Sequence, residues 1–169
     1  MVFDCQVLCK ALPVFPDIRR KDRTLDDEQT LHLLKTGEYG FLAICGANDY
    51  GYGIPMNYVL EGKSIYFHCA IEGFKLESIR KNNRVSFCVV GRTQLLPGQF
   101  STAYESAFVY GHIIYQLAED ERHKALNLLV AKYSPDYADI SRAYIDKSFH
   151  RTNILRLDIE HISGKSKKN

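Results

Sequence analysis

The amino-acid sequence predicts a mainly β protein, built as a closed antiparallel β-barrel with added helices. Strand-like runs follow one another at short spacing between residues 39 and 117, and the longer helical patterns come late, between residues 120 and 147. A chain of 169 residues that is 46% hydrophobic and 25% charged can form one well-buried core and has the composition of a globular domain. No GxGxxG motif follows the first strand, so the sequence does not favour a Rossmann nucleotide-binding fold.

The chain before the first strand combines an extended arm with one helix. Pro13 and Pro16 cannot donate backbone hydrogen bonds, so we expect residues 1–18 to form an extended arm. Thr24 is a suitable N-cap for the following helix, and the acidic residues after it suit the positive end of a helix dipole. Gly37 is a natural stop, so the helix is expected between Thr24 and Gly37.

Strand-like patterns predict six strands after this helix. They are expected over residues 39–45, 52–60, 64–69, 84–91, 105–117 and 152–159. Pro55 cannot donate to a sheet ladder, so the second strand should be unpaired or bulged near it. Gly111 suggests a bend or bulge in the fifth strand. Further helices are expected over residues 73–81, 120–133 and 135–147.

Composition and charge argue against several classes of function. The net charge is only +2, so no nucleic-acid partner is expected, and no run approaches the ~20 apolar residues that cross a bilayer. The N-terminus lacks a cationic region before its apolar residues, unlike a secretory signal. Two local basic clusters are most simply solvated ends, with phosphate or membrane contact as the alternative. They are Arg19, Arg20, Lys21 and Arg23, and then Lys165, Lys167 and Lys168.

Cysteine and histidine usage indicates neither a disulfide framework nor a metal site. The five cysteines are an odd number without a CxxC pair, which is typical of a reducing cytoplasm. Cys5 and Cys9 could pair or bind a metal, but nothing later in the sequence completes a site. The six histidines are scattered without HExxH or a His/Cys cluster, so no metal ligands are expected. Hydrolase GxSxG and Walker-type motifs are also absent from the sequence.

One segment combines features of an anion site. In HCAIEGFKLESIRKN, His68 ends a strand, Gly73 permits close backbone approach and Lys75 starts a helix. Free N–H groups and the helix dipole attract phosphate, and the lysine adds a full positive charge. The simpler alternative is an ordinary strand–turn–helix with a surface lysine.

Two other segments are more ambiguous. In IPMNY, a ladder break at Pro55 would free backbone groups to meet a polar ring edge, and Asn57 offers both a donor and an acceptor. A bulged edge strand is the alternative there. In TAYESAFVYG, the strand period would place Tyr104, Phe108 and Tyr110 on one face. Such an aromatic stripe is more often part of a core than of a cofactor site.

Together these segments resemble the pyridoxamine 5′-phosphate oxidase-like flavoproteins, and most closely their nitroimidazole-resistance branch. The matching segments are RRKDRTLDDEQ, GEYGFLAI, YGIPMNYVLEGKSIYFHCAIEGFKLESIRKNNRVSFCVVG, KYSPD and KSFHRTNILRLDIEHISGK. The resemblance divides the chain into an extended arm (1–18), an FMN-binding split-barrel domain (19–165) and a basic C-terminal tail (166–169). It implies a six-stranded antiparallel split β-barrel with flanking helices, which forms a homodimer with FMN at the interface.

The resemblance also implies which residues form the cofactor site. The flavin ring is expected to lie along a wall made by Pro55, Met56, Asn57, Tyr58, His68, Cys69 and Ala70. The phosphate end is expected at Gly73, Lys75 and Leu76. The partner subunit is expected to contribute Glu105 and Ser106. Phe149 stands where many relatives carry Trp, so it would cover the flavin without an indole hydrogen bond.

The function implied by the resemblance is an FMN-dependent oxidoreductase with nitro-aromatic compounds or similar small electrophiles as electron acceptors. His68 is the candidate catalytic residue, because an imidazole that titrates near neutral pH can deliver a proton. The alternative is that His68 only hydrogen-bonds phosphate or backbone. The C-terminus lacks the Arg- and Trp-bearing segment with which pyridoxamine phosphate oxidases bind their product, so that substrate is not expected. A non-catalytic flavin- or haem-binding protein on the same barrel is the alternative function.

Overall fold

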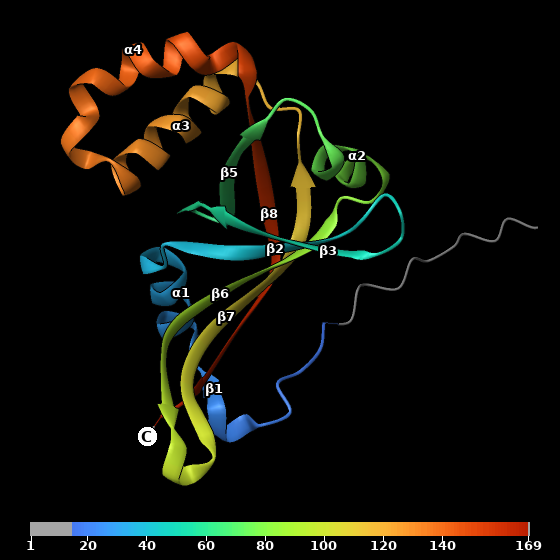
Figure 1. Cartoon of the computed structure of the whole chain (residues 1–169), viewed down its shortest axis with the longest axis vertical. Coiled ribbons are helices and arrows are strands. Elements are labelled where there is room, and N and C mark those ends of the chain that lie inside the picture. The colour runs from blue at the N-terminus through green and yellow to red at the C-terminus, as the bar shows by residue number, and fades with distance from the viewer. Residues whose placement is uncertain (1–14, 169) are drawn as a thin grey trace, which may run out of the picture.

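The computed structural model describes residues 15–168, so most of the expected arm (1–18) lies outside the described residues. Its centre is one curled antiparallel sheet with the strand order β3-β2-β6-β7-β8-β5-β4, and β1 pairs with β8 (Figure 1). The strands are β1 (Thr24–Leu25), β2 (Tyr39–Cys45), β3 (Gly51–Asn57), β4 (Val59–Glu61), β5 (Ser64–Ala70), β6 (Arg84–Leu96), β7 (Ser101–Ile114) and β8 (Thr152–Lys167). The helices are α1 (Asp27–Thr36), α2 (Phe74–Lys81), α3 (Glu119–Tyr133) and α4 (Ala138–Ser148).

The sheet is an open half-barrel rather than a closed barrel. Its two ends are β3 and β4, which do not pair with each other within residues 15–168. This confirms the split barrel that the resemblance implies and corrects the closed barrel expected from strand spacing alone. Two short strands, β1 and β4, bring the number described to eight instead of the expected six.

α1 begins later than the sequence prediction, because Asp26 rather than Thr24 is its N-cap. The Asp26 carboxylate accepts a hydrogen bond from the Gln29 backbone N–H at 2.7 Å, and the Gln29 side chain accepts one from the Asp26 N–H at 3.4 Å. This reciprocal pair satisfies two backbone donors that otherwise lack partners at a helix start. Thr24 instead lies in β1, opposite Lys165 of β8. Because Thr24 is paired in the sheet, it does not cap α1.

Asp26→Ala should lower the free energy of unfolding by roughly 0.5–2 kcal/mol, because the Gln29 N–H loses its acceptor. Thr24→Ala is the matched control, since the Thr24 side chain is exposed and caps no helix. Its effect should stay within about 0.5 kcal/mol. Chemical denaturation followed by circular dichroism measures both values. Equal destabilisation by the two variants would contradict the cap assignment.

Pro55 does not interrupt the sheet. β3 pairs with β2 along its whole length without a register shift, and Pro55 lies opposite Phe41. β3 is an edge strand, and alternate backbone N–H groups of an edge strand point away from its neighbour, so a proline is accommodated there. The prediction of an unpaired or bulged strand at Pro55 is therefore wrong.

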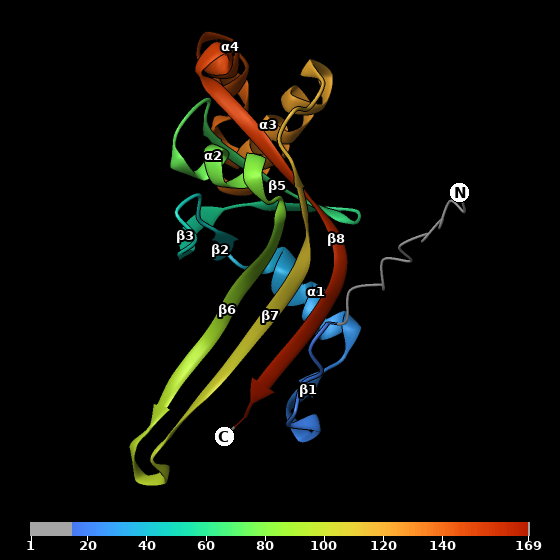
Figure 2. The ribbon, with the colours of Figure 1, turned by 90° about the vertical axis from the view of Figure 1, so that its right-hand side faces the viewer.

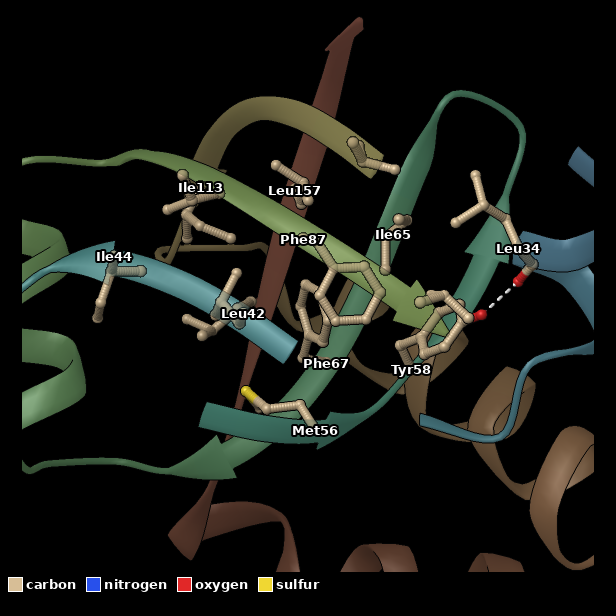
Figure 3. Packing of buried hydrophobic residues seen from close by; sticks show 14 of the residues in the cluster. Leu34, Leu42, Ile44, Met56, Tyr58, Ile65, Phe67, Phe87, Ile113 and Leu157 are labelled. Carbon is tan, nitrogen blue, oxygen red and sulfur yellow. Dashed lines mark hydrogen bonds between the residues drawn. The ribbon is translucent and has the colours of Figure 1, made fainter. Parts of the chain in front are cut away.

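The strand expected over residues 52–60 ends at Asn57 and resumes in β4. Between them Tyr58 is fully buried, and its hydroxyl donates a hydrogen bond to the Leu34 carbonyl of α1 at 2.6 Å (Figure 3). The Tyr58 backbone N–H donates to the Tyr133 hydroxyl of α3 at 2.8 Å. These contacts turn the chain and fix the end of β3 relative to α1 and α3.

Three strands extend well beyond their predicted limits (Figure 2). β6 reaches Leu96 and β7 starts at Ser101, so their hairpin projects from the body as a long arm. β8 continues to Lys167, so two residues of the expected basic tail lie in this strand. The expected irregularity at Gly111 is confirmed, because the register of β7 and β8 shifts between Tyr110 and Gly111.

The interior of the half-barrel is filled from one face of the sheet. Leu42, Phe67 and Phe87 are fully buried. The Phe87 ring meets those of Tyr58 and Phe67 edge to face, with centroids 4.9 and 5.0 Å apart (Figure 3). A second apolar cluster packs α3 against β5 and β8. Burial of these side chains is the main favourable contribution to folding.

The aromatic stripe of β7 lies on the outside of the barrel, which corrects the interpretation as core. Ala107 and Val109 are fully buried, whereas Phe108 is 36% exposed and Tyr110 is only half-buried. The strand alternation was predicted correctly, but the small side chains face the core and the large ones face outward. The sheet therefore carries an apolar outer face.

Candidate functional site

α2 is fixed onto the turn between β2 and β3 by its own side chains. Ser78 Oγ accepts a hydrogen bond from the Ala47 backbone N–H at 2.9 Å, and Lys81 Nζ donates to the Ala47 carbonyl at 2.7 Å. The rings of Phe74 and Tyr52 meet edge to face with centroids 5.2 Å apart. The start of α2 is therefore fixed beside the edge strand β3.

The first turn of α2 offers backbone donors to a ligand. Gly73 precedes the helix with φ of +120°, a backbone conformation that glycine adopts far more readily than other residues. A Cβ added there would meet no atom within 4 Å, and no side chain in residues 15–168 caps this helix end. Uncapped N–H groups at a helix start favour an anion.

Lys75 adds a positive charge to the surface between β3, the end of β5 and the start of α2, which we call the opening. Its ammonium lies 3.6 Å from the Met56 sulfur of β3, and Met56 itself is buried. Lys75 takes part in none of the ion pairs formed within residues 15–168. A thioether is only a weak acceptor, so the ammonium keeps its capacity to bind an anion.

His68 and Cys69, near the end of β5, lie within electrostatic reach of Lys75. Burial lowers the pKa of His68 and the positive charge of Lys75 lowers it further, although solvent still reaches the ring. Burial raises the pKa of the Cys69 thiol, with Lys75 acting in the opposite direction. At neutral pH the opening therefore holds a neutral imidazole and a protonated thiol beside one cation.

The opening brings together several of the residues predicted from the sequence. They are Met56, His68, Cys69, Gly73 and Lys75. On its rim, Pro55 and Asn57 are exposed on the outer face of β3, and Ala70 is exposed at the end of β5. The Asn57 amide donates a hydrogen bond to the Glu38 carbonyl at 3.1 Å, so it already has a partner within the chain.

Other predicted residues lie elsewhere. The side chains of Tyr58 and Leu76 are in the core, with 0% and 2% exposure. Their backbone N–H groups are also engaged, that of Tyr58 by the Tyr133 hydroxyl and that of Leu76 by the Gly73 carbonyl. Glu105 lies on β7, where it borders the end of α1, and Ser106 follows it. α1 and α2 lie on different sides of the barrel (Figure 1), so one chain does not bring Glu105 to Lys75.

Phe149 is engaged by α3. Its ring stacks on His123 with centroids 4.0 Å apart, and the Arg122 guanidinium carbon lies 4.1 Å from the ring centroid. Arg122 also donates hydrogen bonds to the carbonyls of Phe149 and Thr152, at 3.1 and 2.6 Å. Phe149 therefore anchors the short helix η4 (Phe149–Arg151) to α3. A flavin could contact only the part of the Phe149 ring that His123 and Arg122 do not cover.

Sequence reasoning missed two α3 residues that fix the turn between β3 and β4. Lys132 Nζ donates to the carbonyls of Gly37 and Tyr58, at 2.7 and 3.0 Å, and lies 3.9 Å from the Tyr58 ring centroid. The Tyr133 hydroxyl donates to the Glu38 carbonyl at 2.6 Å. The partners of Lys132 lie up to 95 residues away in sequence, so no local pattern could reveal them.

The chain matches a known family over most of its length. A family model described as pyridoxamine 5′-phosphate oxidase matches residues 26–166. The chain belongs to this family. The match spans β2 to β7, all four helices and the opening at Lys75, and it confirms the resemblance inferred from the sequence.

Solved structures that share the fold of this pyridoxamine 5′-phosphate oxidase family member are distant in sequence. A candidate 5-nitroimidazole antibiotic resistance protein from Bacteroides thetaiotaomicron is 21% identical, with 85% of this chain and 86% of that chain covered and a TM-score of 0.69. An FAD-binding protein from Mesorhizobium loti is 22% identical, with 86% and 98% covered and a TM-score of 0.62. A flavocytochrome from Azotobacter vinelandii is 18% identical, with 90% and 73% covered and a TM-score of 0.78. At these identities the likeness shows the fold alone, and no curated protein matches the chain.

The described part of this family member has few other candidate features. Within residues 15–168, no helix has the length and apolar character to span a membrane. The same residues contain no group of three or more His, Cys, Asp or Glu side chains that could hold a metal ion. Cys45, Cys69 and Cys88 are free thiols, and Cys5 and Cys9 lie outside the described residues.

Proposed function

We propose that the chain binds FMN at the opening between β3, β5 and α2 and uses it to reduce small electron acceptors. The observation that carries this proposal is Lys75 at the uncapped start of α2, a cation without a carboxylate partner in the described chain. A lysine beside free backbone N–H groups suits a phosphate, and Gly73 leaves room for its close approach. The FAD-binding protein and the flavocytochrome of the same fold support a flavin, and the choice of FMN is our proposal.

Different residues around the opening would bind the cofactor and transfer the proton. Lys75 and the first N–H groups of α2 would bind the phosphate, and β3 from Pro55 to Asn57 would lie along the ring. The bound flavin supplies hydride and electron transfer. His68 would protonate the reduced substrate when its ring is protonated; the lowered pKa makes the imidazolium a stronger acid but confines this protonated form to lower pH.

The outer face of the sheet supports a homodimer. Phe108 of β7 lies opposite Cys88 of β6, which lies opposite Phe41 of β2, and the row continues to Pro55 of β3. Phe41 is 47% exposed and Phe108 is 36% exposed. A contiguous apolar surface of this kind marks an interaction site, and this one leads directly to the proposed flavin wall. A second copy related by two-fold symmetry would cover it and bring its own β7 to the cofactor.

Phe41→Glu should convert the dimer to a monomer, because a carboxylate would be buried against an apolar partner surface. Tyr144→Glu is the matched control, since Tyr144 is 69% exposed on α4 and lies away from the apolar row. Light scattering gives the mass of each variant, and visible absorbance gives its flavin content. Phe41→Glu should lose both the dimer and the flavin, and Tyr144→Glu should lose neither. A wild-type monomer that retains its flavin would contradict the shared cleft.

The colour and reactivity of the purified protein test the proposed function. Visible flavin absorption is expected, and chromatography of the released cofactor distinguishes FMN from FAD. After anaerobic reduction with dithionite, a nitroimidazole should reoxidise the protein. Tightly bound flavin that no small electrophile reoxidises would instead favour a non-catalytic flavin-binding protein, and a haem spectrum would overturn the choice of cofactor.

A further inference from the structure

The arm formed by β6 and β7 ends in an exposed apolar tip. Residues 93–102, which form the end of the arm, contain no charged side chain. Leu95 is 75% exposed, and Phe100, which follows the short helix η2 (Pro97–Gln99), is 99% exposed. Proteins usually protect exposed strands with charged side chains. An apolar tip without charges therefore favours a segment that another surface covers.

The backbone of Phe100 supports the same conclusion. Its φ of +48° and ψ of +45° are left-handed, a conformation that is rare for bulky residues and that glycine or asparagine adopts more readily. Within the described chain the Phe100 ring is almost wholly exposed, so packing in its own subunit does not explain a phenylalanine there. Unfavourable backbone conformations of this kind cluster at functional sites.

The tip continues the apolar outer face that the proposed homodimer uses. Phe108 and Thr102 are an even number of residues apart in β7, so their side chains lie on the same face of the sheet. Leu95 of β6 is paired with Thr102 and therefore shares this face. The exposed Val90 of β6 is paired with Ser106, between them. One apolar surface therefore extends from Phe108 to the end of the arm.

The arm is long enough to reach across a second copy. Phe100 precedes Glu105 by five residues. A partner that brings its Glu105 to the flavin therefore carries its Phe100 up to about 17 Å beyond that point. The arm and α2 lie towards opposite ends of the molecule (Figure 2), and a two-fold rotation about an axis across the strands exchanges these ends. The arm of one copy would then point to the α2 end of the other.

A receiving surface of matching character lies beside the opening. Ile71, just before Gly73, is exposed, and so is Phe74, the first residue of α2. The contact of the Phe74 ring with Tyr52 fixes its position at the edge of the opening. Two exposed apolar side chains therefore flank the backbone at which the flavin phosphate is proposed to bind.

We propose that the arm of one subunit lies along its partner and packs Phe100 on the partner's Ile71 and the partner's Phe74. This inference rests on the homodimer and the flavin site of the proposed function. The Phe100 ring would cover the phosphate end of the flavin in the other subunit and slow the release of the cofactor. Because a two-fold dimer is symmetric, each arm covers the opening of the other subunit.

The extent of the apolar face favours a protein surface over a membrane. From the tip back to Val90 the face covers about 20 Å of strand. Segments that bind at a membrane surface are buried by only about 5–10 Å, so insertion of the tip would leave Val90 in water. A second copy of the chain could cover the whole face.

Photo-crosslinking of the purified full chain tests the contact. Benzoylphenylalanine in place of Phe100 should give a covalent dimer on irradiation. Mass spectrometry should find the link in the tryptic peptide 64–75, which contains Ile71 and Phe74. The same probe in place of Tyr144, an exposed ring of α4, is the matched control and should give no covalent dimer.

Phe100→Asn tests the effect on the cofactor. Asparagine suits the left-handed backbone, so the variant should fold, and the Phe41 surface should keep it dimeric. FMN should dissociate about 10-fold faster or more, as expected when a buried phenylalanine contact is lost. Ile71→Ser should have a similar effect, and the double variant should add little, because both changes remove one contact. Tyr144→Asn is the control and should leave the rate unchanged.

Several results would overturn the proposal. A dimer that gives no covalent product, or a product linked outside residues 64–75, would place the tip elsewhere. An unchanged FMN dissociation rate in Phe100→Asn would remove the covering role. Binding to phospholipid vesicles that Phe100→Asn abolishes would identify a membrane as the covering surface. These results leave flavin binding at Lys75 untouched, whereas a monomeric wild-type protein would also overturn the shared cleft of the proposed function.

Discussion

His68→Gln is expected to slow turnover of the flavin-loaded protein by about 10²- to 10⁴-fold, the usual loss when an acid–base group is removed. Glutamine keeps a polar side chain of similar reach but does not titrate. Since solvent reaches His68 and the core does not depend on it, the variant should fold and retain its flavin. Steady-state reduction of a nitroimidazole, corrected for flavin content, measures the loss.

The pH profile should change in the same variant. Burial and the charge of Lys75 hold the pKa of His68 below its usual value of 6.5, so the protonated form is populated only at lower pH than for a free imidazole. If His68 donates the proton, activity falls as the pH rises through this lowered pKa. His68→Gln should lose that dependence together with the rate.

A second histidine controls for the loss of any imidazole. His150→Gln changes an exposed histidine of η4 and should leave rate and pH profile as they are. If His68→Gln loses flavin while the remaining holoprotein turns over normally, His68 positions the cofactor and transfers no proton. If His68→Gln keeps full flavin occupancy, full activity and an unchanged pH profile, His68 neither positions the cofactor nor transfers a proton.

Strand prediction succeeded where one face of a strand is buried and failed where both faces are open. Residues 84–91 alternate between core and surface, but Arg92 to Leu95 are all exposed, so the arm of β6 shows no burial period. β8 was expected to end at residue 159 for a different reason: most of its later residues are half-buried on both faces, so they show no alternation between core and surface. The helix start is a different case: Asp26 and Gln29 form a recognisable capping box, so the sequence did contain the signal that distinguishes Asp26 from Thr24.

The candidate site was predictable where its residues are close in sequence. His68, Gly73 and Lys75 follow one another through a strand, a turn and a helix, so a single segment identifies them. The approach of Met56 to Lys75 depends on the curl of the sheet and is not local. The outward position of Phe108 was missed because apolar size suggests the core, whereas this side chain suits a surface that a second chain would cover.

Lys75→Ala is expected to weaken FMN binding by about 10- to 150-fold, which corresponds to a lost charge-assisted contact of roughly 1.5–3 kcal/mol. Riboflavin has the same ring without the phosphate, so its affinity should change far less. Arg80→Ala is the matched control, because it removes an exposed cation from the same helix. Fluorescence titration of each apoprotein variant with FMN and with riboflavin measures the four affinities.

The same substitution should also act on His68. The positive charge of Lys75 is the second cause of the lowered His68 pKa, after burial, so Lys75→Ala should raise that pKa towards 6.5 without reaching it. Arg80→Ala should leave the His68 pKa unchanged. An NMR titration of the histidine ring protons measures this pKa in both variants. A raised pKa with unchanged FMN affinity would mean that Lys75 lies beside His68 but does not bind phosphate. Equal loss of FMN and riboflavin would mean that Lys75 supports the packing of α2 against Met56, and the phosphate would then need another cation.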